Sequence, residues 1–257
     1  MPTATRATVV EKSRARHARP ARPALPSAIP YTTALLRWQR GVHSDVMRAM
    51  GLREDALDPT TQARLRGTLS QLHVRLGMRR PPMAAIASVA EGVRKHAAKE
   101  AKKLLGVPAH ADVAPLITAF RAANVQLIQS LPQRLLADVD DLLTTFDGAS
   151  VADLAEALRE RFTVDDARAA LIARDQTLKL NGQLQRAEQE SVGCISYLWS
   201  SSKDERVRDG HSALDGLEFR WSDPPVVDER TGRREHPGQD FQCRCVAIPV
   251  LPDLLRD

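Results

Sequence analysis

Apolar residues recur every three or four positions through most of the chain before residue 190. This spacing predicts a series of amphipathic helices separated by glycine, proline and Asp-Gly signals. Ser150 and Thr163 are expected to cap the last two helices, and Pro132 to open the one before them. The predicted helices cover residues 32–50, 59–77, 83–105, 113–129, 132–146, 152–162 and 163–190.

After Gly193 the pattern changes to short stretches in which apolar and polar residues alternate. These stretches predict three strands, at residues 195–199, 217–221 and 245–250. Three serines followed by acidic residues predict a helix over residues 203–211, and residues 230–239 are expected to form a charged loop. Alternation along the first two strands predicts one aromatic cluster beneath that helix, made of Tyr197, Trp199, Phe219 and Trp221.

The predicted fold class is α+β: a mainly helical N-terminal region, followed by a small C-terminal α+β module with a short antiparallel sheet. A chain of 257 residues is long enough for one or two domains with their own cores. The predicted organisation is a disordered basic arm at 1–30, a helical region at 31–110, a second helical region at 111–192 that leads into the module, and the module at 193–257.

Charge is distributed unevenly along the chain, although the net charge is only +5. Residues 1–30 and 64–103 are rich in arginine and lysine, whereas residues 138–166 are acidic. This asymmetry indicates that the N-terminal half contacts a polyanion or an acidic protein surface, and a solvated helix face is the alternative. The candidate residues for DNA or partner binding are Arg14, Arg16, Arg19, Arg22, Arg94, Lys95, Lys99, Lys102 and Lys103.

Residues 1–30 lack apolar periodicity and contain several prolines, so they are expected to be disordered in the free protein. No apolar run approaches the length of a membrane span, and the basic N-terminus lacks the apolar core of a secretory signal. Three cysteines do not form a disulfide framework. Synthesis in a reducing, intracellular place is therefore expected.

Several motifs occur together in the C-terminal region: the Tyr197/Trp199 pair, K-D-E-R-V-R-D-G-H at 203–211, L-D-G at 214–216 and P-G-Q-D-F-Q-C-R-C at 237–245. With them, and with the stretches at 124–128 and 167–181, the chain from about 120 to 250 resembles the phage head morphogenesis family, the Mu F-like minor head proteins. The resemblance implies structural roles for Tyr197, Trp199, Asp204, Arg206, Arg208, His211, Asp215, Gly216, Trp221, Pro237, Gly238, Cys243, Arg244 and Cys245.

The C-R-C run raises the question of a metal site. Cysteines two residues apart in a strand point to the same face, and zinc binds cysteine and histidine. In the resembling family, some members have cysteines where this chain has Arg208 and His211, and an arginine cannot bind a metal. The site is therefore either degraded or completed by His236 or Asp240. The sequence predicts no required cofactor, with zinc as the alternative, and the candidate ligands are His211, His236, Cys243 and Cys245.

The polar residues of the module also permit a catalytic interpretation. On a helix, Asp204, Arg208 and His211 would share one face, with His211 as a base. Structural ion pairs are favoured instead, in which an arginine such as Arg244 braces a small module. The chain contains no phosphate-binding loop or H-E-x-x-H motif, and Cys194 has no adjacent base, so no enzyme is predicted.

The resemblance implies a structural virion protein made in the host cytoplasm. It would be a minor head protein inside the capsid, associated with the portal and in contact with packaged double-stranded DNA, scaffold or capsid proteins. One alternative is a toxin-type or other enzyme built on the same module; such chains carry an extra domain, whereas this sequence ends at Asp257 soon after the C-R-C run. A DNA-binding regulator is the other alternative, although no helix-turn-helix pattern is evident.

Overall fold

The computed structural model describes residues 21–52, 59–146 and 150–252. The chain divides into two compact units. The helical unit comprises Ala28–Ser88 and Arg121–Arg174, and the module unit comprises Met1–Ser27, Val89–Phe120 and Asp175–Asp257. The units are interleaved along the sequence because the third, fourth and fifth helices each contribute to both.

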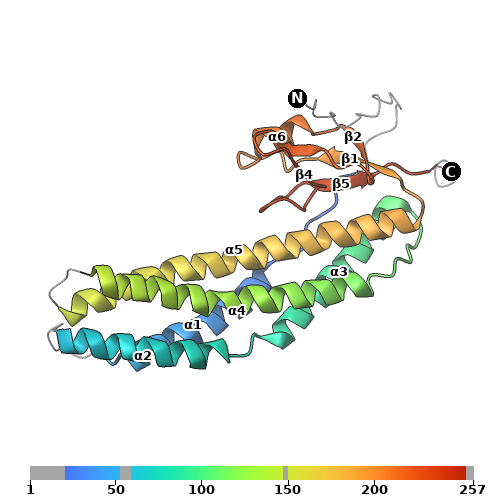
Figure 1. Cartoon of the computed structure of the whole chain (residues 1–257). Coiled ribbons are helices and arrows are strands. Elements are labelled where there is room, and N and C mark those ends of the chain that lie inside the picture. Colours follow the sequence, from blue (N-terminus) through green and yellow to red (C-terminus); the bar gives the residue numbers. More distant parts are fainter. Residues whose placement is uncertain (1–20, 53–58, 147–149, 253–257) are drawn as a thin grey trace. The chain divides into compact units, whose positions relative to one another are not determined.

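The described residues between 29 and 191 are mainly helical, as the apolar spacing predicts. Figure 1 shows the long helices in chain order, followed by the short strands of the C-terminal module. The helices are α1 (Ile29–Met50), α2 (Pro59–Gly77), α3 (Met83–Leu105), α4 (Ala114–Thr145) and α5 (Val151–Ser191). The predicted α+β fold class is confirmed.

Two predicted helix boundaries are wrong. Pro132 lies inside α4 rather than at the start of a new helix, in a turn where its neighbours Leu131 and Leu135 are fully buried. Burial of those side chains compensates for the single backbone hydrogen bond that a proline removes. Thr163 does not cap a helix either, because its hydroxyl donates to the carbonyl of Arg159 at 3.1 Å, and α5 continues through it.

The predicted cap at Ser150 is confirmed. The Ser150 hydroxyl oxygen accepts the backbone N–H of Asp153 at 3.2 Å, and the hydroxyl donates to the Asp153 carboxylate at 2.6 Å. Ser150 is thus a serine N-cap; in a full capping box the acidic side chain accepts the backbone N–H of the capping residue, whereas here the Asp153 carboxylate accepts the Ser150 hydroxyl. The cap supplies a partner for one of the backbone N–H groups that the first turn of α5 leaves unpaired.

The core of the helical unit is aliphatic. Leucine and valine side chains from the apolar faces of α1, α2, α4 and α5 pack together. The side chains of this cluster are almost completely buried. Its buried members are Val42, Val46, Met50, Leu65, Leu69, Leu72, Leu76, Leu135, Leu136, Val139, Leu142, Leu143, Leu154, Leu158 and Phe162.

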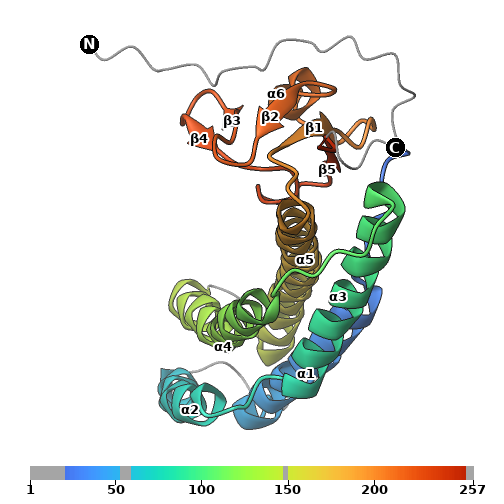
Figure 2. The same cartoon turned by 90° about the vertical axis from the view of Figure 1, so that its right-hand side faces the viewer.

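The C-terminal module contains a three-stranded antiparallel sheet of order β2-β1-β5. Its strands are β1 (Ser196–Ser200), β2 (Glu218–Arg220) and β5 (Val246–Pro249), close to the three predicted strands. A separate antiparallel ribbon pairs β3 (Val226–Asp228) with β4 (Arg233–Arg234). Figure 2 shows these strands together with the short helix α6 (Asp209–Ala213).

Two local predictions in the module are corrected. The helix expected over residues 203–211 is confined to α6, because Lys203 adopts a left-handed conformation (φ 56°) and the chain turns before Asp209. The charged loop expected at 230–239 contributes β4. Its charged side chains are compatible with a strand because they form ion pairs, such as that of Arg234 with Asp223.

The described end of the predicted basic arm, residues 21–28, is held by contacts. Ala24 donates its backbone N–H to the Glu100 carboxylate at 3.2 Å, and its carbonyl meets His96 Nε2 at 2.9 Å. Arg22 donates to the carbonyl of Arg244 at 2.5 Å. These contacts anchor this segment to α3 and to the C-R-C run, and the remainder of the predicted arm, 1–20, lies outside the described residues.

Candidate functional site

The predicted aromatic cluster forms the centre of the module. Tyr197 and Trp199 of β1 are buried with Phe219 of β2 and with Trp221. The rings of Tyr197 and Trp221 lie 4.2 Å apart between centroids, and those of Trp199 and Phe219 meet edge to face at 6.4 Å. The antiparallel pairing of Tyr197 with Phe219 brings the two strands' aromatic residues together.

His236 belongs to this aromatic core and not to the cysteines. Its Nδ1 lies 2.9 Å from the Tyr197 hydroxyl, and its ring meets the Trp221 ring at 5.1 Å. Burial, together with the charge of Arg186, lowers the pKa of His236 to about 4. The ring is therefore neutral at pH 7, and its Nδ1 can accept a hydrogen bond from the Tyr197 hydroxyl. His236 lies outside the group of possible metal ligands among the described residues.

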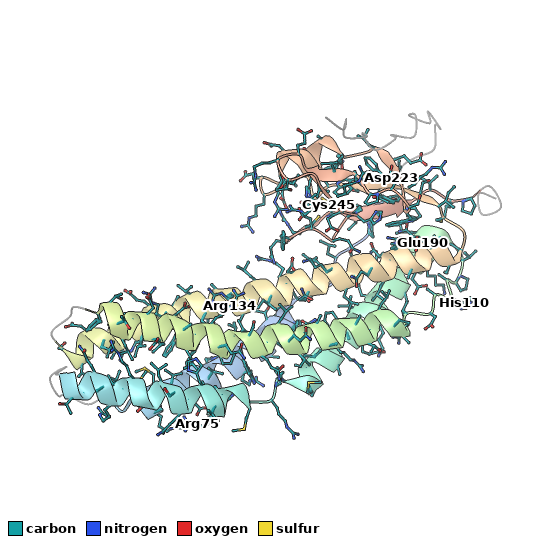
Figure 3. The ribbon with its side chains drawn as sticks, in the orientation of Figure 1. Arg75, His110, Arg134, Glu190, Asp223 and Cys245 are labelled. Carbon is teal, nitrogen blue, oxygen red and sulfur yellow. The ribbon has the colours of Figure 1, made fainter. Side chains whose placement is uncertain are left out.

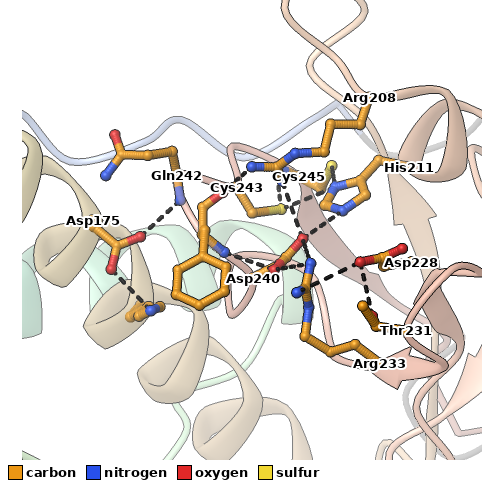
Figure 4. Close-up of polar contacts among 12 residues, drawn as sticks. Asp175, Arg208, His211, Asp228, Thr231, Arg233, Asp240, Gln242, Cys243 and Cys245 are labelled. Carbon is orange, nitrogen blue, oxygen red and sulfur yellow. Dashed lines mark hydrogen bonds and ion pairs between the residues drawn. The ribbon is translucent and has the colours of Figure 1, made fainter.

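The other three candidate ligands converge. His211 Nδ1 lies 3.5 Å from the sulfur of Cys243 and 3.5 Å from the sulfur of Cys245. All three side chains are buried, and their ligand atoms lie within 4.8 Å of one another. Figure 4 shows His211 facing both sulfur atoms, and Cys245 lies inside the module in Figure 3. Three of the four predicted ligands thus form one cluster, the His-Cys-Cys cluster.

Asp240 organises the side of the cluster away from the sulfur atoms. Its carboxylate lies 3.0 Å from His211 Nε2, and Arg208 and Arg233 each approach it at 3.0 Å. Asp240 is only 2% exposed, so its buried charge needs these partners. Arg208 cannot coordinate a metal. It instead forms an ion pair with the Asp240 carboxylate, beside the cluster.

The three side chains of the cluster shift one another's pKa values. Burial lowers the pKa of His211, but hydrogen bonds and charges from Cys243 and Asp240 outweigh it, so the pKa is raised. The hydrogen bond from Cys245, with His211 beside it, lowers the pKa of Cys243 to about 5. Cys245, in turn, has a raised pKa because of the adjacent Cys243 sulfur and burial. The metal-free cluster thus favours a Cys243 thiolate beside a protonated His211.

Residues 143–248, which include the whole of this site, match the family described as Phage Mu protein F like protein. This part of the chain belongs to the Phage Mu protein F-like family. The resemblance seen in the sequence motifs is thereby confirmed, and the module described above is a Mu F-like module.

Two curated proteins are similar to part of this chain. The chain is 39% identical over 142 residues to an uncharacterized protein of Haemophilus influenzae, a match that covers 54% of this chain and 30% of the relative. It is 25% identical over 145 residues to minor head protein GP7 of Bacillus phage SPP1, which covers 53% of this chain and 46% of the relative. The chain thus spans less than half the length of these relatives, and no solved structure matches it.

Two of the Mu F-like motifs are explained by close backbone contacts. Gly238 has a left-handed φ of 81° and lies against Gly182 of α5, where an added Cβ on Gly182 would meet the carbonyl of Pro237 at 2.9 Å. Gly210 of the D-G-H run similarly approaches the carbonyl of Val227, at 2.9 Å from an added Cβ. Gly182 and Gly210 need glycine because a side chain would push the elements apart, and Gly238 needs it because of its left-handed φ.

The remaining polar residues of the Mu F-like motifs brace the module's loops. Arg244 forms a two-pronged pair with the Asp204 carboxylate, with one contact at 2.7 Å. Asp215 accepts the backbone N–H of Ser201 at 2.8 Å. Arg206 is exposed. Asp204, Arg208 and His211 do not share a helix face, so the catalytic arrangement considered for them is absent.

Sequence analysis missed Asp175 and Arg233. Asp175 of α5 accepts the backbone N–H of Gln242 at 2.7 Å, at a residue whose φ of 51° is unusual for a non-glycine side chain. Arg233 contacts Asp240 and also lies over the Phe241 ring. Asp175 is one acid among many charged residues of a long helix, so the local sequence does not indicate its contact with Gln242. For Arg233, its position in a charged loop was a weak indication of an ion pair.

The predicted basic binding residues divide into four groups. Arg94 and Lys95 pair with Glu91, and Lys103 pairs with Glu100, all within α3. Lys99 and Lys102 are exposed on the same helix. Arg14, Arg16 and Arg19 lie outside the described residues, and Arg22 contacts Arg244.

Among the described helices, none is long and apolar enough to cross a membrane.

Proposed function

We propose that this chain is a phage minor head protein that acts in head morphogenesis. The observation that carries the proposal is the match of residues 143–248 to the Phage Mu protein F-like family, together with the similarity to a relative named minor head protein GP7. The role is structural: the polar residues of the module are used in ion pairs and caps rather than in an open catalytic arrangement.

The proposal extends to location and partners. The protein sits inside the capsid next to the portal and contacts capsid or scaffold proteins and packaged double-stranded DNA. The basic N-terminal region supports the DNA contact, since arginines at 14, 16, 19 and 22 precede the exposed Lys99 and Lys102 of α3. Phosphate contacts from such residues require no base sequence.

Mass spectrometry of purified particles tests the head assignment. Particles of the phage or prophage that encodes the chain are separated into DNA-filled and DNA-free heads, and the protein is quantified against the major capsid protein. Presence in both classes, at a fixed low copy number, supports a minor head protein. Absence from both classes, with the protein detected in the producing cells, overturns the assignment.

A salt titration of DNA binding tests the nucleic-acid contact separately. Removal of residues 1–20 leaves the anchored segment at 21–28 in place, and each lost phosphate contact should lower the slope of log affinity against log salt by about 0.9. Replacement of Arg14, Arg16 and Arg19 by lysine is the matched control and should preserve the slope. An unchanged slope after the deletion contradicts the proposed contact, and selectivity for one DNA site would indicate a regulator instead.

A further inference from the structure

The His-Cys-Cys cluster has the composition of a transition-metal site. One imidazole nitrogen faces two cysteine sulfurs, and the three side chains come from α6 and from the C-R-C run. His211 is 2% exposed, Cys243 is 3% exposed and Cys245 is 4% exposed. Thiolate and imidazole are the ligands that zinc prefers. Without an ion, the buried imidazole and the two cysteine side chains would have to share protons through hydrogen bonds at these short distances.

The distances also fit a tetrahedral ion. Zinc–sulfur bonds of about 2.3 Å and zinc–nitrogen bonds of about 2.0–2.1 Å, joined at the tetrahedral angle, place sulfur and nitrogen about 3.5 Å apart. Both Cys243 and Cys245 sulfurs lie 3.5 Å from His211 Nδ1. Both nitrogen–sulfur distances therefore match those expected when one ion is bound to all three atoms.

The surroundings orient the histidine as a ligand. Asp240 accepts the Nε2–H of His211 at 3.0 Å, which leaves Nδ1 to face the sulfur atoms. A carboxylate behind a metal-bound histidine is the usual arrangement outside the ligand shell. The Trp199 ring packs edge-on against the His211 ring with centroids 5.6 Å apart, and the backbone N–H of Cys245 points to the Cys243 sulfur at 3.4 Å.

Charge balance is compatible with an ion in this buried position. Two thiolates and one divalent cation sum to zero, so the occupied site adds no net charge to the interior. The nearby Asp240 carboxylate is balanced separately by Arg208 and Arg233. We propose that His211, Cys243 and Cys245 bind one zinc ion, with a neutral water molecule as the fourth ligand.

Cys194 provides an internal contrast. It is equally buried, at 1% exposure, but packs among Ala101, Leu105 and other apolar side chains. Burial raises the pKa of its thiol, as expected for a cysteine that only fills space. Unlike Cys243 and Cys245, Cys194 belongs to no group of possible metal ligands among the described residues.

Metal analysis of the full chain, purified without chelator, tests the proposal. We expect about one equivalent of zinc in the wild type and in the matched control Cys194→Ser, and a loss of stoichiometric zinc in Cys243→Ser and in Cys245→Ser. Asp240→Asn should weaken zinc binding about 10–100-fold in chelator competition. His236→Gln should retain the ion, which distinguishes the two buried histidines of the module.

Cobalt substitution provides a measurement that does not depend on whether the variants fold. Cobalt added to metal-stripped wild-type protein should give an intense tetrahedral d–d spectrum and a thiolate charge-transfer band, both removed by one equivalent of zinc. Folded wild type that binds neither ion overturns the proposal. A mass two units lower, with both sulfurs unreactive, would show a Cys243–Cys245 disulfide, and rapid alkylation of one thiol despite added zinc would show a nucleophilic cysteine; each result contradicts the metal site.

Discussion

The helical unit and the Mu F-like module bury different kinds of side chain. The helical unit packs leucine and valine from four helices into one aliphatic cluster. The module packs four aromatic rings, two cysteines and two histidines around strands of three to five residues. Short strands offer few inward positions, so each buried side chain of the module must be large or must make a directional polar contact.

The difference extends to buried polar groups. The helical unit includes a buried pair of His43 with Asp165, 3.1 Å apart, and the His43 ring stacks on Phe162 at 4.3 Å. The module instead places Asp240 at the centre of contacts with a histidine and two arginines. Aliphatic packing is spread over many similar contacts, whereas a polar and aromatic core depends on a few positions.

The largest expected effect is the loss of an aromatic ring from the module. Trp221→Ala should cost about 3–5 kcal/mol, comparable with the net stability of a small domain. Limited proteolysis should then cut the chain after Gly193 while the helices of the helical unit persist. Trp38→Ala is the matched control, because Trp38 is half-buried in the helical unit. If Trp221→Ala is cut no faster than wild type after Gly193, the aromatic cluster is not what holds the module.

The reciprocal change is a cavity in the aliphatic core. Leu135 is fully buried in α4, and Leu135→Ala should cost about 2–5 kcal/mol of helical-unit stability. Helical circular dichroism during urea unfolding should show the loss, while the proteolytic pattern after Gly193 stays unchanged. Leu171→Ala, at a leucine that is 45% exposed, should shift the midpoint much less. Equal shifts for the two variants would contradict the assigned core.

Acid should weaken the module through His236. The unfolded histidine titrates near 6.5 and the folded one at about 4, so below pH 6.5 the unfolded chain binds a proton that the folded chain excludes. The stabilisation is complete above the unfolded value and is lost as the pH falls toward the folded value. At pH 5 the loss is about 2 kcal/mol.

Urea unfolding at pH 7 and pH 5, followed by fluorescence in a Trp38→Phe background with chelator present, measures this effect on Trp199 and Trp221. His236→Gln keeps an acceptor for the Tyr197 hydroxyl but does not titrate, so its decrease between the two pH values should be smaller by the same amount. His211 has a raised pKa, so its protonation stabilises the folded module as the pH falls. This contribution is present in both the wild type and the His236→Gln variant. Identical decreases in the two proteins would refute the role of His236.

The smallest expected effect is at a helix cap, a feature that depends on local sequence. Ser150→Ala removes the acceptor for the Asp153 N–H and should cost about 1 kcal/mol of helical-unit stability. Ser150→Asp is the matched control and should retain most of the stability, since aspartate also caps helices. A thermal melt followed by circular dichroism measures both, and no difference between alanine and aspartate would show that the cap is not used.

Periodicity and local signals determined the helices, the three main strands and the cap at Ser150. Those features depend on residues within a few positions of one another, so they are visible in the chain itself. The same signals misplaced boundaries at Pro132 and Thr163, where tertiary burial and a hydroxyl bond to the preceding turn allowed the helix to continue. Local propensity is weaker than the packing of a long apolar face.

The composition of the C-terminal motifs identified the family and its candidate residues, but only the tertiary structure decided how those residues are grouped. His211 and His236 are alike in sequence terms, yet one faces two sulfur atoms and the other a tyrosine hydroxyl. Asp240 meets Arg208 across 32 positions and Asp175 meets Gln242 across 67. Such pairings depend on how turns and strands bring distant segments together, and no periodic pattern along the chain records that distance.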